Sequence, residues 1–290
     1  MAPGIGVVGT LRRRDDWCVR IQVSQNEYDA HTLDDDTLKA VMEAMETDGY
    51  AVLGGAVDPA VLDAMKPKLD EDTEELLRRG KWGGAGELPG HLQQSMSRSK
   101  EHIYSDIVTN PLVIQVTSEI LGEGVHNHFY NGNTNMPGSK TQPLHRDSGH
   151  LWPDLIHPTT SIVINMSPID VTEENGATEI WPGTHHIPGG THVTEEAEAE
   201  RRAVVPPVRA VSQKGDAVLR DIRMWHRGVP NNSTEGRHMI GMVHSKWFYL
   251  RGTTIPVTAG AVHSFDNDVL RTRVEVVPDD YDYLSEFLRP

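Results

Sequence analysis

The fold is decided by the stretch at 214–244, which reads KGDAVLRDIRMWHRGVPNNSTEGRHMIGMVH. A Gly-Asp turn leads into a mostly apolar run at 217–221, which predicts a strand. A second turn, rich in Gly, Pro and Asn, follows at 228–231, and the chain then enters another strand that begins with Arg237. The stretch therefore predicts a hairpin with His226 near one end and Arg237 at the start of its second strand.

The second half of the chain has the same texture of short strands separated by turn residues, which predicts a mainly β fold. Two insertions interrupt it, one after Asp147 and one at 194–202, where EEAEAERR favours a short exposed helix. The expected strands are 126–130, 161–166, 177–181, 217–221 and 237–247.

The first half predicts helices that flank this β region. Apolar residues at helical spacing follow three aspartates from Asp34 and stop at Gly49, and Asp58 with Pro59 begins a second helix that runs towards residue 80. Pro67 is expected to kink or split that helix. Short strands are expected at 17–23 and 50–53, and a loop at 80–90.

No repeat of fixed period and no low-complexity linker divides the chain, which favours one domain over residues 1–290. This domain is expected to comprise an N-terminal extension (1–30), a helical flank (31–107), a β core with lid insertions (108–250) and a C-terminal segment (251–290).

His145 and Asp147, in the run QPLHRDSGH, have the spacing of a possible metal-binding pair. Positions i and i+2 of a strand project from the same face, so an imidazole and a carboxylate placed there can bind one ion. The alternative is a surface strand with two polar residues. Together with His226 the pair would form two histidines and one carboxylate around an ion with three open positions, which suits Fe(II) and oxygen chemistry.

Three motifs in this order resemble the phytanoyl-CoA dioxygenase family of Fe(II)/2-oxoglutarate oxygenases. They are QPLHRD, ENGATEIWPGTHH and GDAVLRDIRMWHRGVPNNSTEGR, and DGYAVLGGAVD is similar to the opening strand of that family. The resemblance runs from about Tyr50 to Trp247. It implies a double-stranded β-helix, that is, a cupin-like jelly roll with the metal at one open end.

By this resemblance, His145, Asp147 and His226 are the Fe(II) ligands, 2-oxoglutarate and O2 are cosubstrates, and succinate and CO2 are released. Arg237 is expected to bind the distal carboxylate of 2-oxoglutarate, because a guanidinium offers a bidentate fork of fixed charge. Gln142 and Thr178 are expected to contact the same cosubstrate, although ordinary strand polarity would also explain them.

The expected substrate is a small, mostly apolar organic molecule, with a role in specialised metabolism. Tyr130, Trp152 and Trp225 are aromatic residues near the motifs and are candidates for the pocket wall. Asp147 favours hydroxylation or a related C–H oxidation over halogenation, because a halogenase of this kind leaves the carboxylate position to chloride. Desaturation, cyclisation and peroxidation remain open.

Composition limits the partners. The 290 residues include 27 basic and 42 acidic side chains, a net charge of −15 that disfavours binding to nucleic acid. No apolar run is long enough to span a bilayer, and the N-terminus lacks the order of a secretory signal. Cys18 is the single cysteine, which excludes an internal disulfide framework and suits a cytoplasmic location.

Two other classes of protein remain compatible with the sequence. A non-oxidative isomerase or hydrolase could use the same ligands for zinc or manganese, but it has no need of a carboxylate-binding Arg237. A jelly roll that binds a small molecule without catalysis would not need the intact triad. A homodimer is possible, in which the C-terminal segment at 281–290 closes the pocket of a neighbouring chain.

Overall fold

The computed structural model describes residues 20–80, 88–249 and 254–286. Eight strands form the main sheet in the order β1–β2–β8–β5–β10–β4–β12, with β3 paired to β4, and a smaller sheet has the order β7–β6–β9. The strands are β1 (Arg20–Gln22), β2 (Tyr50–Gly54), β3 (His91–Ser95), β4 (His126–Asn135), β5 (Ser161–Met166), β6 (Glu179–Ile180), β7 (Val208–Arg209), β8 (Ala217–Asp221), β9 (His226–Arg227), β10 (Arg237–Ser245), β11 (Ile255–Thr258), β12 (Arg271–Thr272) and β13 (Val274–Val277).

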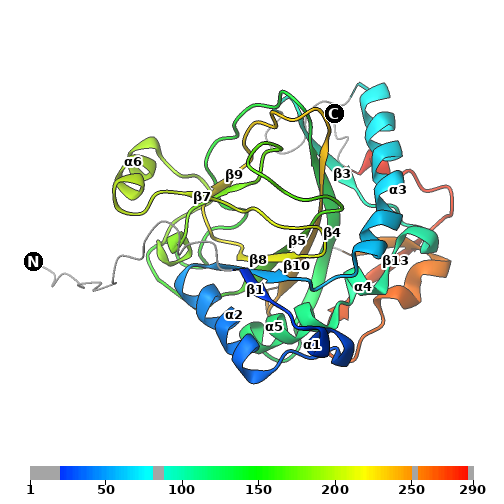
Figure 1. Ribbon diagram of the computed structural model, residues 1–290, viewed down its shortest axis with the longest axis horizontal. Coiled ribbons are helices and arrows are strands. Elements are labelled where there is room, and N and C mark those ends of the chain that lie inside the picture. Colours follow the sequence, from blue (N-terminus) through cyan, green and yellow to red (C-terminus); the bar gives the residue numbers. More distant parts are fainter. Residues whose placement is uncertain (1–19, 81–87, 250–253, 287–290) are drawn as a thin grey trace, which may run out of the picture.

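Helices flank the sheets. Helices α1, α2 and α5 lie together beside the main sheet, α3 stands near β3, and α6 projects from the opposite side of the molecule (Figure 1). No helix in the described ranges is both long enough and apolar enough to cross a bilayer. Their bounds are α1 (Gln25–Ala30), α2 (Asp35–Thr47), α3 (Pro59–Arg78), α4 (Ser105–Val108), α5 (Pro111–Leu121) and α6 (Glu195–Val204).

The two faces of β10 have different roles. Ile240 and Met242 belong to the hydrophobic core, which also contains side chains of α2 and α5. Met239, Gly241 and Val243 alternate with them and line a cavity, as period-two alternation requires. The same cavity is lined by His226 of the smaller sheet, so it lies between the two sheets. One face of the main sheet therefore holds the fold together and the other is free for binding.

The prediction of a mainly β fold with flanking helices is confirmed. Strands β5 and β8 have the predicted bounds, and α2, α3 and α6 lie where helices were expected. Pro67 does not split α3, which is continuous around it. The strand expected at 17–23 is described only from Arg20, and residues 81–87 of the expected loop lie outside the described ranges.

Helix α5 was not predicted. Its β-branched residues favour a strand, but the side chain of Asn110 accepts a hydrogen bond from the backbone N–H of Val113, and Pro111 occupies the first turn. Strand β3 was also missed, because its sequence HLQQS is polar. Two of its side chains, His91 and Gln93, line the cavity, so hydrophobic alternation gave no signal.

Glu27 gives the fold a pH-dependent contribution at α1. Burial alone would raise the pKa of Glu27, but hydrogen bonds from Ser24 and Asp34 lower it from 4.5 to about 2. This contribution is complete above the unfolded-state pKa and is lost as the pH falls towards 2. We expect Glu27→Gln to lower the free energy of unfolding by about 1–3 kcal/mol at pH 7 and by about half that or less at pH 3. Urea denaturation at both pH values measures this, and an equal loss at both would contradict it.

Candidate active site

Three side chains converge at the open end of the cavity. His145, Asp147 and His226 each present one ligand atom, and these atoms lie within 4.8 Å of one another. Oδ1 of Asp147 is 3.4 Å from Nε2 of His226 and 3.9 Å from Nε2 of His145. The cluster predicted from widely separated motifs is therefore present, with the donor set of a metal site.

Strand register explains why the cluster forms. His145 and His226 face each other in an antiparallel bridge, and each backbone N–H donates to the other's carbonyl at 3.1 and 3.0 Å. Asp147 follows two residues after His145, in the bend next to this bridge. Arg146, between them, points away, where its guanidinium donates to carbonyl oxygens at 187 and 190 and lies 5.1 Å from the centre of the Trp225 ring.

Backbone carbonyls orient both imidazoles. Nδ1 of His145 lies 2.9 Å from the carbonyl oxygen of Pro143, and Nδ1 of His226 lies 3.0 Å from that of Met224. A proton held on each Nδ1 leaves each Nε2 lone pair directed at the cluster. Burial, followed by the proximity of His226, lowers the pKa of His145 to about 4, so this ring is neutral at pH 7. The two imidazoles are therefore oriented so that their Nε2 atoms can bind a metal ion.

Arg237 lies buried in the cavity wall with an incomplete set of partners. Its Nη2 donates to the carbonyl oxygen of Gly176 at 3.3 Å, whereas Nε and Nη1 have no hydrogen-bond partner among the described residues. Burial lowers the pKa of Arg237 to about 10, which leaves it charged at pH 7. A buried cation with unpaired donors is costly unless an anion binds there.

Gln142 and Thr178 both line the cavity. The side-chain oxygen of Gln142 accepts a hydrogen bond from the backbone N–H of Gly228 at 2.7 Å, which holds the amide beside the turn after β9. Thr178 directly precedes β6 and also lines a narrow adjoining pocket together with Arg220 and Arg237. Thr178 therefore shares the narrow pocket with Arg237, whereas Gln142 shares only the main cavity with it.

Arg220 of β8 is a site residue that the sequence reasoning missed. Its side chain is 9% exposed, and its Nη2 forms an ion pair with Oδ2 of Asp147. Burial would raise the pKa of Asp147, but the charge of Arg220, followed by the proximity of His226, holds it well below its usual value. The signal was an arginine within the apolar strand AVLRD, where a charged side chain needs a buried partner.

The cavity has a volume of about 500 Å³ and two kinds of lining side chain. An apolar cluster and carboxamide side chains from three strands lie beside one another on the same face of the main sheet. These polar positions were not predicted. They alternate with core residues along their strands, and the sequence does not show that this second face lines a cavity and not solvent. The apolar cluster is Phe129, Val163, Ile222 and Val243, and the carboxamides are Gln93, Asn131, Asn133 and Asn165.

The three aromatic candidates for the pocket wall are corrected by the structure. Tyr130 is buried in the core, on the opposite face of β4, where its ring centre is 6.0 Å from that of Phe265. Trp225 packs in a separate cluster with Trp181, because it points the opposite way from His226. Trp152 is 52% exposed in the loop after Asp147. None of the three lines the cavity among the described residues.

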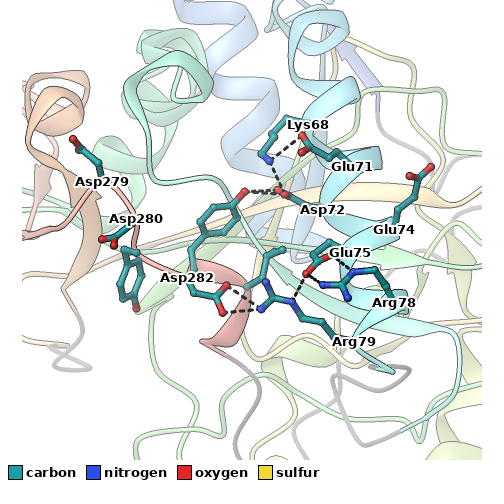
Figure 2. A pocket seen from close by; sticks show the side chains of 13 residues that line it. Lys68, Glu71, Asp72, Glu74, Glu75, Arg78, Arg79, Asp279, Asp280 and Asp282 are labelled. Carbon is teal, nitrogen blue, oxygen red and sulfur yellow. Dashed lines mark hydrogen bonds and ion pairs between the residues drawn. The ribbon is translucent and has the colours of Figure 1, made fainter.

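A second hollow of about 610 Å³ lies between α3 and the C-terminal segment (Figure 2). Its cations are each paired: Lys68 with Asp72, Arg78 with Glu75 and Arg79 with Asp282. Further along the segment, Glu286 pairs with the buried Arg98. The C-terminal segment to Glu286 therefore packs on its own chain, and this hollow has no free cation to bind an acidic ligand among its described residues.

The residues around the triad fit an iron ion and 2-oxoglutarate. Two imidazoles and one carboxylate are a donor set that suits Fe(II). The orphaned donors of Arg237 match the distal carboxylate of 2-oxoglutarate, which a guanidinium can bind through two hydrogen bonds. An isomerase or hydrolase would not need a buried arginine with unpaired donors at this position, whereas an oxygenase that binds 2-oxoglutarate would.

Two curated dioxygenases are similar in sequence to this chain. Dioxygenase trt7 from Aspergillus terreus is 27% identical over 214 residues, which cover 70% of this chain and 72% of that protein. The iron/alpha-ketoglutarate-dependent dioxygenase okaE from Penicillium ochrochloron is 31% identical over 109 residues, 36% of this chain and 33% of that protein.

A solved structure supports the fold. The crystal structure of AviO1 from Streptomyces viridochromogenes Tue57 superposes with a TM-score of 0.55 and 22% identity, and covers 74% of this chain and 96% of that one. At this identity the likeness concerns the fold alone. Two sheets facing each other across a cavity agree with the expected cupin-like jelly roll.

The sequence also matches the phytanoyl-CoA dioxygenase (PhyH) family over residues 45–239, more than half of the chain. That range includes the triad, Arg220 and Arg237, so the matched region contains the charged residues of the candidate site. The chain therefore belongs to the phytanoyl-CoA dioxygenase family and is an Fe(II)- and 2-oxoglutarate-dependent oxygenase that uses O2.

Proposed function

We propose that His145, Asp147 and His226 hold the Fe(II) of this oxygenase. The observation that carries this assignment is the convergence of their ligand atoms within 4.8 Å, with both imidazoles oriented by backbone carbonyls. When bound, the iron supplies the site at which O2 and 2-oxoglutarate are consumed, with succinate and CO2 released as a C–H bond of the substrate is oxidised. The remaining protein groups orient the reactants and exclude water.

Arg237 is proposed to bind the distal carboxylate of 2-oxoglutarate. Its two unpaired donors are buried in the wall that the cavity shares with a narrow side pocket. The hydroxyl of Thr178 lies on the same pocket, and Gln142 lines the main cavity beside it. We propose that these two polar side chains add hydrogen bonds to the cosubstrate, whereas the charge of Arg237 provides most of the affinity.

The walls of the cavity support a neutral substrate with an apolar part and a hydrogen-bonding part. The apolar cluster of Phe129, Val163, Ile222 and Val243 favours a hydrocarbon portion. The neighbouring carboxamides favour hydroxyl, carbonyl or amide groups. Apart from the site arginines, no Lys or Arg lines the cavity among the described residues, which disfavours a coenzyme A thioester. The substrate is therefore expected to be less uniformly apolar than the sequence suggested.

Ligand binding under anaerobic conditions tests the metal and cosubstrate assignment. We expect Fe(II) plus 2-oxoglutarate to give a weak charge-transfer band in the visible spectrum of the wild-type protein. Asp147→Ala should lose this band, whereas Asp63→Ala, at an exposed position on α3, should keep it. Tight binding of 2-oxoglutarate without any dependence on iron would contradict the assignment.

Several finer features stay predictions. We propose a single oxygenase domain with a cytoplasmic location and a role in specialised metabolism. Its substrate is a small molecule, and we expect it not to bind nucleic acid. A homodimer is compatible with these features. Hydroxylation or a related C–H oxidation is the proposed outcome, because the carboxylate of Asp147 occupies the position that a halide would need.

A further inference from the structure

The two oxygens of Asp147 have different partners. Oδ1 is the oxygen near both imidazoles, at 3.4 Å from His226 and 3.9 Å from His145. Oδ2 is taken by the guanidinium of Arg220. One oxygen of the Asp147 carboxylate is therefore directed at the proposed metal position, and the other is held by the guanidinium of Arg220.

The strand that carries Arg220 makes this arrangement rigid. Strand β8 lies inside the main sheet, where Arg220 is paired in register with Tyr50 of β2 and Val163 of β5. Its side chain is 9% exposed, and its Nη1 also approaches Nδ1 of His226 at 3.5 Å. A buried guanidinium on a central strand has little freedom to leave the carboxylate.

The pairing of Arg220 with Asp147 affects how many coordination positions of the metal ion stay open. A carboxylate can bind a cation through one oxygen or through both. An octahedral ion held by two imidazoles and one carboxylate oxygen keeps three positions, which are enough for a chelating 2-oxoglutarate and O2. If both carboxylate oxygens bound, one of those positions would be lost.

We propose that Arg220 is a positioning residue that restricts Asp147 to one metal-binding oxygen and so keeps a coordination position open for the cosubstrates. The inference rests on the proposed ligand set. Arg220 also lines the narrow pocket that Arg237 and Thr178 line, so its positive charge favours the dianion 2-oxoglutarate in the same place. Both effects predict that Arg220 matters more for cosubstrate binding than for metal binding.

The test separates these two affinities in the full-length protein. Isothermal titration with Mn(II) alone, and then with 2-oxoglutarate on the Mn(II)-loaded protein, is carried out on wild type, Arg220→Met and Arg220→Lys. We expect Arg220→Met to keep a Mn(II) affinity close to wild type, because the freed carboxylate can bind the ion with both oxygens. Its affinity for 2-oxoglutarate should fall by roughly tenfold or more. Arg220→Lys, which keeps the charge, should recover part of the loss.

Arg20→Met is the matched control. It removes an arginine–aspartate pair to Asp216, at 2.8 Å, that does not line the cavity, so its affinity for 2-oxoglutarate should be unchanged. An unchanged 2-oxoglutarate affinity in Arg220→Met would overturn the proposal. A parallel loss of both affinities in Arg220→Met and Arg220→Lys would also overturn it, because it would show a purely structural role. A wild-type Mn(II) affinity in Asp147→Ala would instead overturn the ligand assignment beneath it.

Discussion

His226→Ala is expected to abolish succinate formation. The variant leaves the ion with only His145 and Asp147, and even the loss of a group that merely supports a metal ligand lowers affinity or activity by roughly 10–100-fold. We therefore expect a larger drop in turnover than that, together with a weaker Mn(II) affinity. Succinate release and isothermal titration measure the two effects.

The control for this variant is His263→Ala. His263 is 88% exposed and pairs only with Asp266 at the surface, so its removal should leave turnover unchanged. Thermal unfolding followed by circular dichroism shows whether His226→Ala is folded, which matters because His226 is buried. A folded His226→Ala protein with wild-type turnover would show that this histidine is not a ligand.

Arg237→Met is expected to separate stability from cosubstrate binding. Without 2-oxoglutarate, the variant should be as stable as wild type or more stable by about 1–3 kcal/mol, because it removes a buried charge with unpaired donors. With the cosubstrate, loss of a charge-assisted pair worth about 1.5–3 kcal/mol should raise the apparent KM for 2-oxoglutarate roughly 10- to 150-fold. The thermal stabilisation that 2-oxoglutarate gives to the Mn(II)-loaded wild type should disappear.

Arg78→Ala serves as the matched control for charge removal. Arg78 is 73% exposed on α3 and pairs with Glu75, so neither KM nor the stabilisation by 2-oxoglutarate should change. If Arg237→Met kept the wild-type affinity for 2-oxoglutarate, the unpaired donors of Arg237 would serve another ligand and the carboxylate assignment would be wrong.

The sequence was sufficient to predict the triad because its residues lie in motifs with a definite backbone conformation. The spacing of His145 and Asp147 predicts a strand or an extended loop, and in the structure His145 lies in an antiparallel bridge while Asp147 lies in the bend that follows it. The predicted hairpin itself is wrong, because β8 and β10 each pair with β5 and not with each other. His226 instead begins β9, which pairs with β6 in the smaller sheet. Local rules were enough where side-chain direction follows from strand alternation.

Features that depend on packing between distant segments could not be predicted in the same way. The pairing of Arg220 with Asp147 joins residues on different segments, and only the register of β8 within the sheet brings them together. Tyr130 and Trp225 failed as pocket residues for the related reason that aromatic character does not reveal which face of a strand is inward. The carboxamides were missed because polar inner positions look like solvent-exposed ones.

The most direct test of the central claim is anomalous diffraction at the iron edge from crystals grown anaerobically with Fe(II) and 2-oxoglutarate. The proposed function predicts one iron peak bonded to Nε2 of His145, Nε2 of His226 and Oδ1 of Asp147, with 2-oxoglutarate extending towards Arg237. An iron peak elsewhere, or a fourth protein ligand on the same ion, would contradict it.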